Sequence, residues 1–187
     1  LEDNEERKTL LKPELEKLNL DYQFFTATDG RSVTDIHGWP GYTGRKRRLI
    51  YGTDFVSGEL GCYASHMRVY RDFLNSGEEA ALILEDDIFI GEDLSGLLHK
   101  LMAFRNDWDI VRCLSNNKNY ACRDLGAVYK DYHLLRLLRA PGGAHCYIIN
   151  RNAARTLLAY EKDIWCPIDL LIGRAYETGL NVYTVMP

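Results

Sequence analysis

The stretch Ala-Ala-Leu-Ile-Leu-Glu-Asp-Asp at residues 80–87 decides the fold of this chain. Its first five residues form an unbroken apolar run, which is typical of a parallel strand covered by helices on both faces. Three acids, Glu85, Asp86 and Asp87, follow the run without a break. Because open α/β sheets bind their ligands at the carboxyl ends of the strands, we expect these acids to lie where a ligand binds.

Strands and helices alternate on both sides of this run. Ahead of it, residues 58–75 have the pattern of an amphipathic helix buried over more than half of its circumference, with Ser57 as the N-cap. The pattern after it predicts helices at 94–104, 151–160 and 168–178 and strands at 109–114, 134–138, 144–149 and 181–185. This alternation predicts an α/β sandwich with a mostly parallel central sheet.

The first third of the chain is less regular. Residues 4–18 have a helical pattern that Pro13 interrupts, so we expect a kinked helix or two short pieces. Residues 22–26 predict a short strand, after which a polar loop continues to Ser57. Loops of this length in compact domains are usually functional or disordered.

Length and composition limit the classes of protein to consider. The chain has 187 residues, of which 46% are hydrophobic and 27% charged, values typical of one soluble globular domain. The net charge of −4 argues against a protein that binds nucleic acid by general electrostatic attraction. No apolar run approaches the ~20 residues that span a bilayer, so we expect a cytoplasmic protein.

The cysteines are spread widely along the chain, and none forms the C-x-x-C pair that suggests a zinc site or thiol redox chemistry. We therefore expect reduced and mostly buried thiols in a reducing compartment. The five residues are Cys62, Cys113, Cys122, Cys146 and Cys166.

The candidate site residues have two interpretations each when the residues alone are considered. Carboxylate oxygens suit Mg²⁺ or Mn²⁺, ions that share their coordination with substrate phosphates, but acids after a strand also cap helices or form turns. His66 could bind phosphate or transfer a proton. Its place on the same side of its helix as Val69 and Phe73 favours a hydrogen-bonded core histidine instead.

Three further features are equally open. The basic run at 44–48 (GRKRR) could meet a phosphorylated acceptor or a membrane surface, or lie solvated in a loop. Residues 140–144 (APGGA) could let the backbone approach a sugar closely, or form a plain turn. Asp169 follows Pro167 at a helix start, where it could act in catalysis or be an acid favoured by the helix dipole.

Taken together, several segments resemble glycosyltransferase family 25, which includes bacterial lipooligosaccharide galactosyltransferases and collagen galactosyltransferases. They follow one another over nearly the whole chain: A-x-D-G at 27–30, G-E-L-G-C at 58–62 with S-H at 65–66, L-I-L-E-D-D at 82–87, W-D-I-V at 108–111, G-G-A-H-C-Y-I-I at 142–149 and P-x-D at 167–169. From this resemblance we expect residues 1–187 to form a single glycosyltransferase domain, with the family's first strand ahead of residue 1 and a further part of the domain beyond residue 187.

The resemblance also implies a GT-A-type, Rossmann-like fold and an inverting transfer of a sugar, usually galactose, from a UDP-sugar donor. It implies a divalent cation, Mn²⁺ or Mg²⁺, held by Asp87 and Glu85. Asp169 is the expected general base, by analogy with other inverting transferases. The residues expected to bind the donor are Asp29, Gly30, Ser65, His66, Glu85 and Asp86.

The expected acceptor is a saccharide such as the lipooligosaccharide core, which would bring the protein into peripheral contact with the inner face of the cell membrane. No nucleic-acid partner is expected. One alternative is a metal-dependent phosphoesterase, although such enzymes commonly add a second set of Asp or His ligands. The other alternative is a non-catalytic module that binds a sugar nucleotide, which donor turnover would distinguish from an enzyme.

Overall fold

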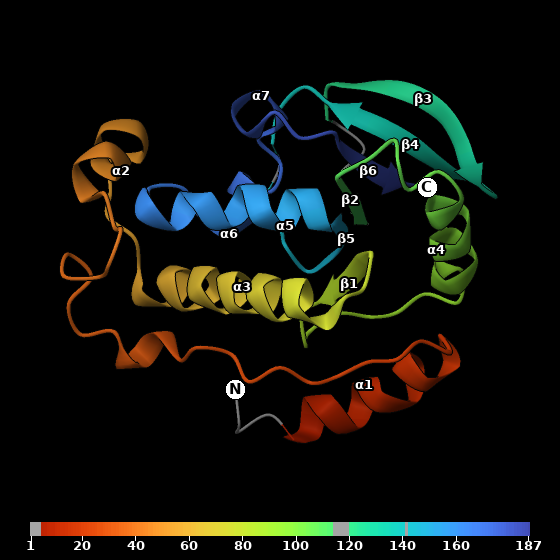
Figure 1. Cartoon of the computed structure of the whole chain (residues 1–187), viewed down its shortest axis with the longest axis horizontal. Helices are drawn as coiled ribbons and strands as arrows, with labels where there is room; N and C mark the ends of the chain where they lie inside the picture. Colours follow the sequence, from red (N-terminus) through yellow and green to blue (C-terminus); the bar gives the residue numbers. More distant parts are fainter. Residues whose placement is uncertain (1–4, 114–119, 141) are drawn as a thin grey trace.

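A mixed sheet runs through the centre of the structure, a computed structural model that describes residues 5–113, 120–140 and 142–187 (Figure 1). Among these residues the sheet has six strands in the order β1-β5-β2-β6-β4-β3. The strands are β1 (Ala80–Leu84), β2 (Ile110–Cys113), β3 (Cys122–Tyr129), β4 (Tyr132–Leu137), β5 (Cys146–Asn150) and β6 (Val182–Met186).

The prediction of a mostly parallel sheet is wrong. Within the described residues only β2 and β6 run parallel, and the other four neighbouring pairs are antiparallel. The apolar strand β1 lies at one edge and pairs antiparallel with β5, so that Leu84 lies opposite Cys146. An apolar run indicates that helices cover a strand on both faces, but it contains no information on the direction of the neighbouring strand.

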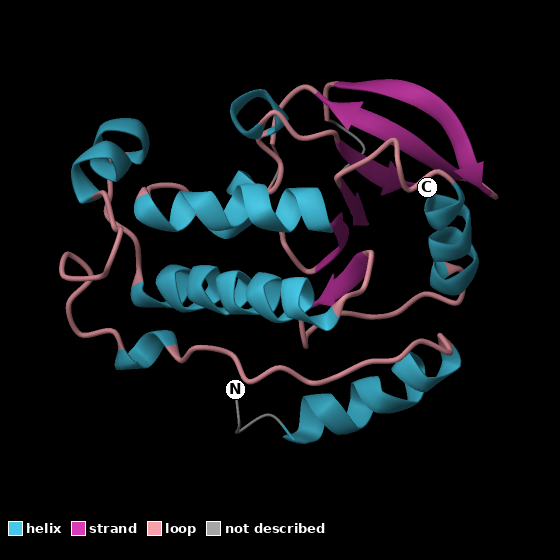
Figure 2. Cartoon of the chain, viewed as in Figure 1, coloured by secondary structure: helices cyan, strands magenta, loops and turns pink. Residues whose placement is uncertain are grey.

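Helices cover both faces of the sheet, as the α/β prediction requires (Figure 2). The α-helices of the described residues are α1 (Glu5–Lys17), α2 (Gly44–Tyr51), α3 (Ser57–Ser76), α4 (Leu94–Ala103), α5 (Arg151–Leu158), α6 (Ile168–Leu171) and α7 (Ala175–Thr178), of which α2 lies away from the sheet (Figure 1). Helices α3 and α5 pack side by side on one face, where Tyr147 and Ile149 of β5 join their core cluster. Between them, Ile148 points to the opposite face and packs under α4, because successive strand residues alternate sides.

Helix α3 confirms the sequence pattern most closely. The predicted apolar stripe is buried, with Leu60, Met67 and Tyr70 at 0% exposure. The prediction of Ser57 as the N-cap is wrong: the helix begins at Ser57 and its N-cap is Val56, whose backbone N–H donates to the side chain of Glu59 at 2.9 Å. The burial of this stripe anchors the helix that carries much of the candidate site.

Several other elements differ from the prediction. Helix α1 is continuous through Pro13, which excludes the alternative of two short pieces, and residues 22–26 form no strand. Strand β3 was not predicted, and the helix expected at 168–178 is divided into α6 and α7. The long loop before Ser57 contains α2 and a short 3-10 turn at Gly30–Ser32.

Candidate functional site

The three acids that follow β1 contact different parts of the molecule. Glu85 lies beside α3, where its Oε1 is 3.9 Å from Nε2 of His66. Asp86 instead accepts a hydrogen bond of 2.9 Å from Nη1 of Arg7 on α1. The carboxylate of Asp87 lies 3.9 Å from the same nitrogen and is exposed. The E-D-D stretch is therefore divided between an inner position at α3 and an outer position at α1.

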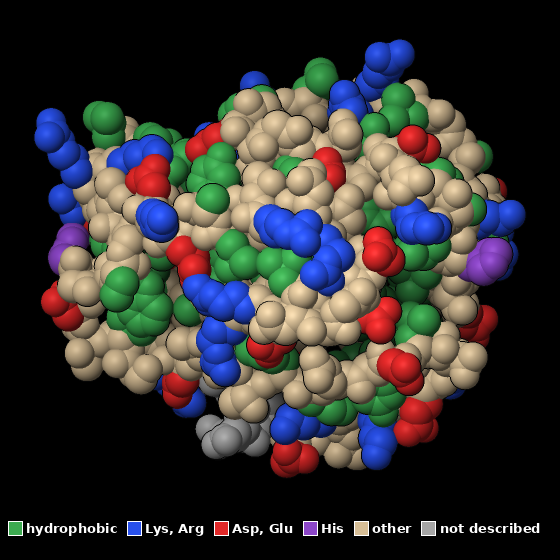
Figure 3. Space-filling model, viewed as in Figure 1, with side chains coloured by type: hydrophobic (Ala, Val, Ile, Leu, Met, Phe, Trp, Pro, Cys, Tyr) green, Lys and Arg blue, Asp and Glu red, His purple; other side chains and the backbone are tan. Residues whose placement is uncertain are grey.

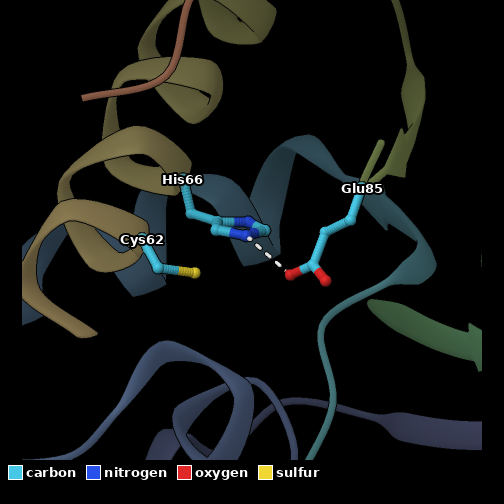
Figure 4. A group of neighbouring side chains, drawn as sticks. All are labelled: Cys62, His66 and Glu85. Carbon is cyan, nitrogen blue, oxygen red and sulfur yellow. Dashed lines mark ion pairs between the residues drawn. The ribbon is translucent and has the colours of Figure 1, made fainter. Parts of the chain in front are cut away.

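The inner position brings three different side chains together (Figure 4). Cys62 and His66 are four residues apart on α3, so they lie on the same face of the helix. The Cys62 thiol, a ring nitrogen of His66 and a carboxylate oxygen of Glu85 all lie within 4.8 Å of one another. His66 is only 6% exposed, whereas 35% of the Glu85 side chain is exposed. The cluster thus has a buried wall and one side open to solvent.

Two buried tyrosines hold the imidazole of His66. Its Nδ1 lies 2.7 Å from the hydroxyl of Tyr147, which lies 2.7 Å from the hydroxyl of Tyr70. Burial raises the pKa of both tyrosines, so they remain neutral. The interpretation of His66 as a hydrogen-bonded core histidine is confirmed, and its second ring nitrogen is left facing Glu85.

Asp169 lies at the start of α6, and two backbone N–H groups fix its carboxylate. Oδ1 accepts the N–H of Leu170 at 2.8 Å, and Oδ2 accepts the N–H of Gly143 at 3.0 Å. A Cβ atom added at Gly142 would lie only 3.0 Å from Oδ2. The glycine pair is thus in close contact with Asp169.

The thiol of Cys62 is affected by the negative charges of two acids, Glu85 and Asp169. Burial, together with the negative charges of Glu85 and Asp169, raises the pKa of the Cys62 thiol to about 12. The backbone N–H of Glu85 also donates to the carbonyl of His145 at 2.9 Å, which links the end of β1 to the segment after the glycine pair. Glu85 and His66 are therefore neighbours in the fold, and Asp169 lies on α6, which packs against the same helix α3.

Arg112 is a site residue that the sequence interpretation missed. It projects from β2, is 1% exposed, and donates to the carbonyl of Gly142 at 2.9 Å and to that of Gly143. Burial lowers its pKa to about 10, while the charge of Asp169 acts in the opposite direction. A Cβ atom at Gly173 would lie 2.7 Å from Nη1, so this glycine leaves room for the guanidinium. A charged residue between the apolar pair Ile110-Val111 and Cys113 is the signal that could have identified it.

The remaining residues expected to bind the donor lie where the long loop meets α3. The N–H of Thr28 donates to Oγ of Ser65 at 2.8 Å, and Asp29 accepts the N–H of Arg31 at 2.9 Å. A Cβ atom at Gly61 would lie 2.7 Å from the backbone nitrogen of Gly30. These residues therefore hold the loop against α3, and their part in donor binding stays a prediction.

The basic run at 44–48 forms α2, where most of its charges have local partners. Arg47 is buried, with its guanidinium 4.3 Å from the ring centroid of Tyr51. Lys46 pairs with Asp163, and Arg48 with Asp54.

Acidic and basic side chains are interspersed over the face shown in Figure 3. No helix in the described part of the chain has the length and apolar character needed to cross a membrane.

The fold and the site define an α/β protein with a carboxylate site at the carboxyl end of β1. The family model described as glycosyltransferase family 25 (LPS biosynthesis protein) matches residues 1–172. This match covers most of the 187 residues. The chain therefore belongs to glycosyltransferase family 25.

Several proteins of this family are similar to the chain over part of its length. Procollagen galactosyltransferase 1-B from Xenopus laevis is 30% identical over 122 residues, covering 59% of this chain and 19% of that protein. A glycosyltransferase 25 family member from Aedes aegypti is 33% identical over 97 residues, covering 47% of this chain and 15% of that protein. The human protein named inactive glycosyltransferase 25 family member 3 is 26% identical over 152 residues, covering 71% of this chain and 24% of that protein. The chain spans at most 24% of the length of these three relatives.

Proposed function

We propose that the chain is an inverting galactosyltransferase domain that transfers a sugar from a UDP-sugar to a saccharide acceptor. Membership of glycosyltransferase family 25 supports the reaction class. Relatives named procollagen galactosyltransferases support galactose as the sugar. The family description as an LPS biosynthesis protein supports a lipooligosaccharide-type acceptor.

The observation that carries this proposal is that two acids from separate elements lie at α3: Glu85 is 3.9 Å from His66 of that helix, and Asp169 belongs to α6, which packs against it. Both charges act on the thiol of Cys62, although the two acids come from β1 and α6. Sugar transfer from a nucleotide-diphosphate sugar needs one group that compensates the charge of the phosphates and one that accepts the proton of the acceptor hydroxyl. Two carboxylates from separate elements, one of them partly open to solvent, can divide these tasks.

In this mechanism Asp169 is the general base. The acceptor hydroxyl attacks the anomeric carbon as its proton passes to the carboxylate, and the bond from that carbon to the diphosphate oxygen breaks. Attack from the face opposite the leaving group inverts the configuration. Each oxygen of Asp169 accepts one backbone N–H, and an ionised carboxylate has further lone pairs for the acceptor hydroxyl. Arg112 acts through the glycine pair and positions this base.

The acids after β1 supply the carboxylate oxygens that Mn²⁺ or Mg²⁺ prefers, but Glu85 lies at α3 and Asp87 at α1, so both can hold one ion only after the Asp87 side chain turns away from Arg7. Asp86 and Asp87 already share one cation, the guanidinium of Arg7, and their exposed oxygens are the hard ligands that such ions prefer. Asp87 and Glu85 would hold the ion, while Asp86, Asp29, Gly30, Ser65 and His66 would line the donor site. When bound, the ion would neutralise charge on the departing diphosphate.

The location of this activity belongs to the same proposal. We place the domain in the cytoplasm, in peripheral contact with the inner face of the cell membrane. Leu49 and Ile50 of α2 are exposed, and Arg45 lies exposed on the same helix. Exposed apolar side chains beside a basic one are the combination that favours binding to an anionic membrane surface.

The test of the proposed function is release of UDP from UDP-galactose in the presence of Mn²⁺, with and without a galactose or lipooligosaccharide acceptor. We expect acceptor-stimulated release of UDP and a product with the β configuration, determined by NMR. Binding of UDP without any turnover would instead identify a sugar-nucleotide-binding module. Release of inorganic phosphate from simple phosphate esters would support a phosphoesterase.

A further inference from the structure

Cys62, His66 and Glu85 form a cluster of three kinds of metal ligand. The carboxylate of Glu85 is also a proposed ligand of the metal ion at the donor site. A thiol, an imidazole nitrogen and a carboxylate oxygen lie within 4.8 Å of one another at the end of β1. From this arrangement we infer that the cluster binds Zn²⁺ through the Cys62 thiolate, Nε2 of His66 and the carboxylate of Glu85. This ion would be distinct from the one proposed for the diphosphate.

The distances require only a small movement to reach zinc geometry. Zinc binds sulfur at about 2.3 Å and nitrogen or oxygen at about 2.0–2.2 Å, so ligand atoms around a tetrahedral ion are about 3.3–3.8 Å apart. Nε2 of His66 and Oε1 of Glu85 are already 3.9 Å apart. Cys62 and His66 lie on adjacent turns of one rigid helix, so Glu85, whose side chain is 35% exposed, is the ligand that moves.

The tyrosine pair orients His66 for this role. Nδ1 lies 2.7 Å from the Tyr147 hydroxyl, so a proton on Nδ1 leaves Nε2 with its lone pair toward Glu85. The 3.9 Å between Nε2 and the carboxylate is too long for a hydrogen bond. Metal-binding histidines nearly always have such a partner on their other nitrogen, which fixes the tautomer and the ring orientation. An ion between Nε2 and Glu85 would join two groups that otherwise do not bond.

The ligand set favours zinc over the ions proposed for the diphosphate. Thiolate and imidazole are ligands that suit Zn²⁺, whereas Mg²⁺ and Mn²⁺ prefer carboxylate and water. Binding would release the thiol proton of Cys62 to solvent, because only the thiolate is a metal ligand. Three protein ligands leave a fourth position for water, and the nearby charge of Asp169 adds to the attraction for a dication.

Zinc at this position would also regulate the proposed reaction, a consequence that rests on the proposed function. The carboxylate of Glu85 cannot bind Zn²⁺ at α3 and Mn²⁺ at the diphosphate at the same time. Zinc should therefore inhibit Mn²⁺-dependent UDP release, and excess Mn²⁺ should reverse the inhibition. The inhibition is expressed for each protein variant as the ratio of two rates of Mn²⁺-dependent UDP release, one measured with zinc and one without it.

Titration of the metal-free protein with Co²⁺ tests the site without any need for activity. We expect one equivalent to give a sulfur-to-cobalt charge-transfer band and the intense visible bands of a tetrahedral ion, with Zn²⁺ removing both by displacement. Cys62→Ser should abolish the charge-transfer band and weaken zinc binding at least about tenfold. Tyr147→Phe, which keeps the buried ring, should weaken it about 10- to 100-fold, as loss of a histidine's orienting partner does.

Cys113→Ser is the matched control. Cys113 is another partly buried thiol, and its loss should leave the cobalt spectrum unchanged. Absence of the charge-transfer band in the parent, or its persistence in Cys62→Ser, would overturn the zinc site. Zinc binding that leaves Mn²⁺-dependent UDP release unaffected would refute the competition for Glu85. A protein that binds zinc at Cys62 but never releases UDP would count against the proposed function alone.

Discussion

Replacing Gly142 with alanine should displace the carboxylate of Asp169 while the fold stays intact. The added Cβ would lie 3.0 Å from Oδ2 of Asp169, whereas ordinary van der Waals contact begins at 3.4 Å. The carboxylate must then retreat by about 0.4 Å, because overlap at shorter range is strongly repulsive. The same oxygen accepts the N–H of Gly143 at 3.0 Å, so this movement also lengthens the hydrogen bond that fixes the base.

The size of the effect follows from the sensitivity of catalysis to position. A misplacement of about 1 Å can cost roughly 10²-fold in rate, so a shift of less than half that distance should lower kcat/KM about tenfold. The free energy of unfolding should change by about 1 kcal/mol or less, because the carboxylate is only partly buried and can move. Steady-state kinetics of UDP release and urea unfolding of the same preparation measure the two quantities.

Gly91→Ala is the control for this substitution. A Cβ atom at Gly91 would meet no other atom within 4 Å, so its kinetics and stability should match those of the parent. The reasoning about Asp169 is refuted if folded Gly142→Ala retains the parent kcat/KM. An equal loss of activity in Gly91→Ala would show that the assay responds to glycine replacement in general.

Three further predictions test the metal site, the core and the loss of stability at acid pH. Asp87→Asn should change the free energy of unfolding by about 1 kcal/mol or less but abolish the Mn²⁺-dependent part of UDP binding in a thermal-shift titration; a much lower melting temperature would instead make Asp87 a structural residue. Leu60→Ala, at a position with 0% exposure, should cost about 2–5 kcal/mol in urea unfolding, and a loss below 1 kcal/mol would contradict the packing of α3. A hydrogen bond from Tyr42 and the charge of Arg48 hold the pKa of Asp54 below its usual 3.8; its stabilising effect is thus full above that value and is lost as the pH falls through the folded-state pKa. Asp54→Asn should flatten the pH dependence of unfolding in that range, and an unchanged loss of stability at acid pH would argue against the pairing.

The sequence predicted the elements with strong local patterns and missed those that depend on distant contacts. The stripe of α3 and the run at 80–84 were found because their periodicity is a property of the segment itself. Strand direction was wrong because it depends on which segment pairs with β1. Strand β3 escaped notice because residues 122–127 are exposed and mix Arg, Asp and Gly with apolar residues, so no alternation marks them.

The candidate site was predictable as a set of acids but not as an arrangement. The resemblance to family 25 pointed to Glu85, His66 and Asp169; the fold brings Glu85 to His66 and places Asp169 on α6, which packs against the helix of His66. Adjacency in the sequence was misleading for the three acids after β1. Asp86 contacts Arg7 and does not lie beside its sequence neighbour Glu85. Arg112 was missed because its partners are backbone carbonyls about 30 residues away, and a contact of this kind leaves no local pattern.

The most direct test of the central claim is the comparison of Asp169→Asn with the parent in two assays, transfer from UDP-galactose and UDP binding in the presence of Mn²⁺. Asparagine keeps one oxygen, which can accept the N–H of Gly143, but it loses the acceptor for the N–H of Leu170, which retains the carbonyl of Pro167. It cannot take a proton from the acceptor. We expect an unchanged UDP affinity and a transfer rate lowered by about 10²-fold or more, the scale expected when a general base is lost. A folded Asp169→Asn protein that transfers sugar at the parent rate would contradict this expectation and would move the base to another residue.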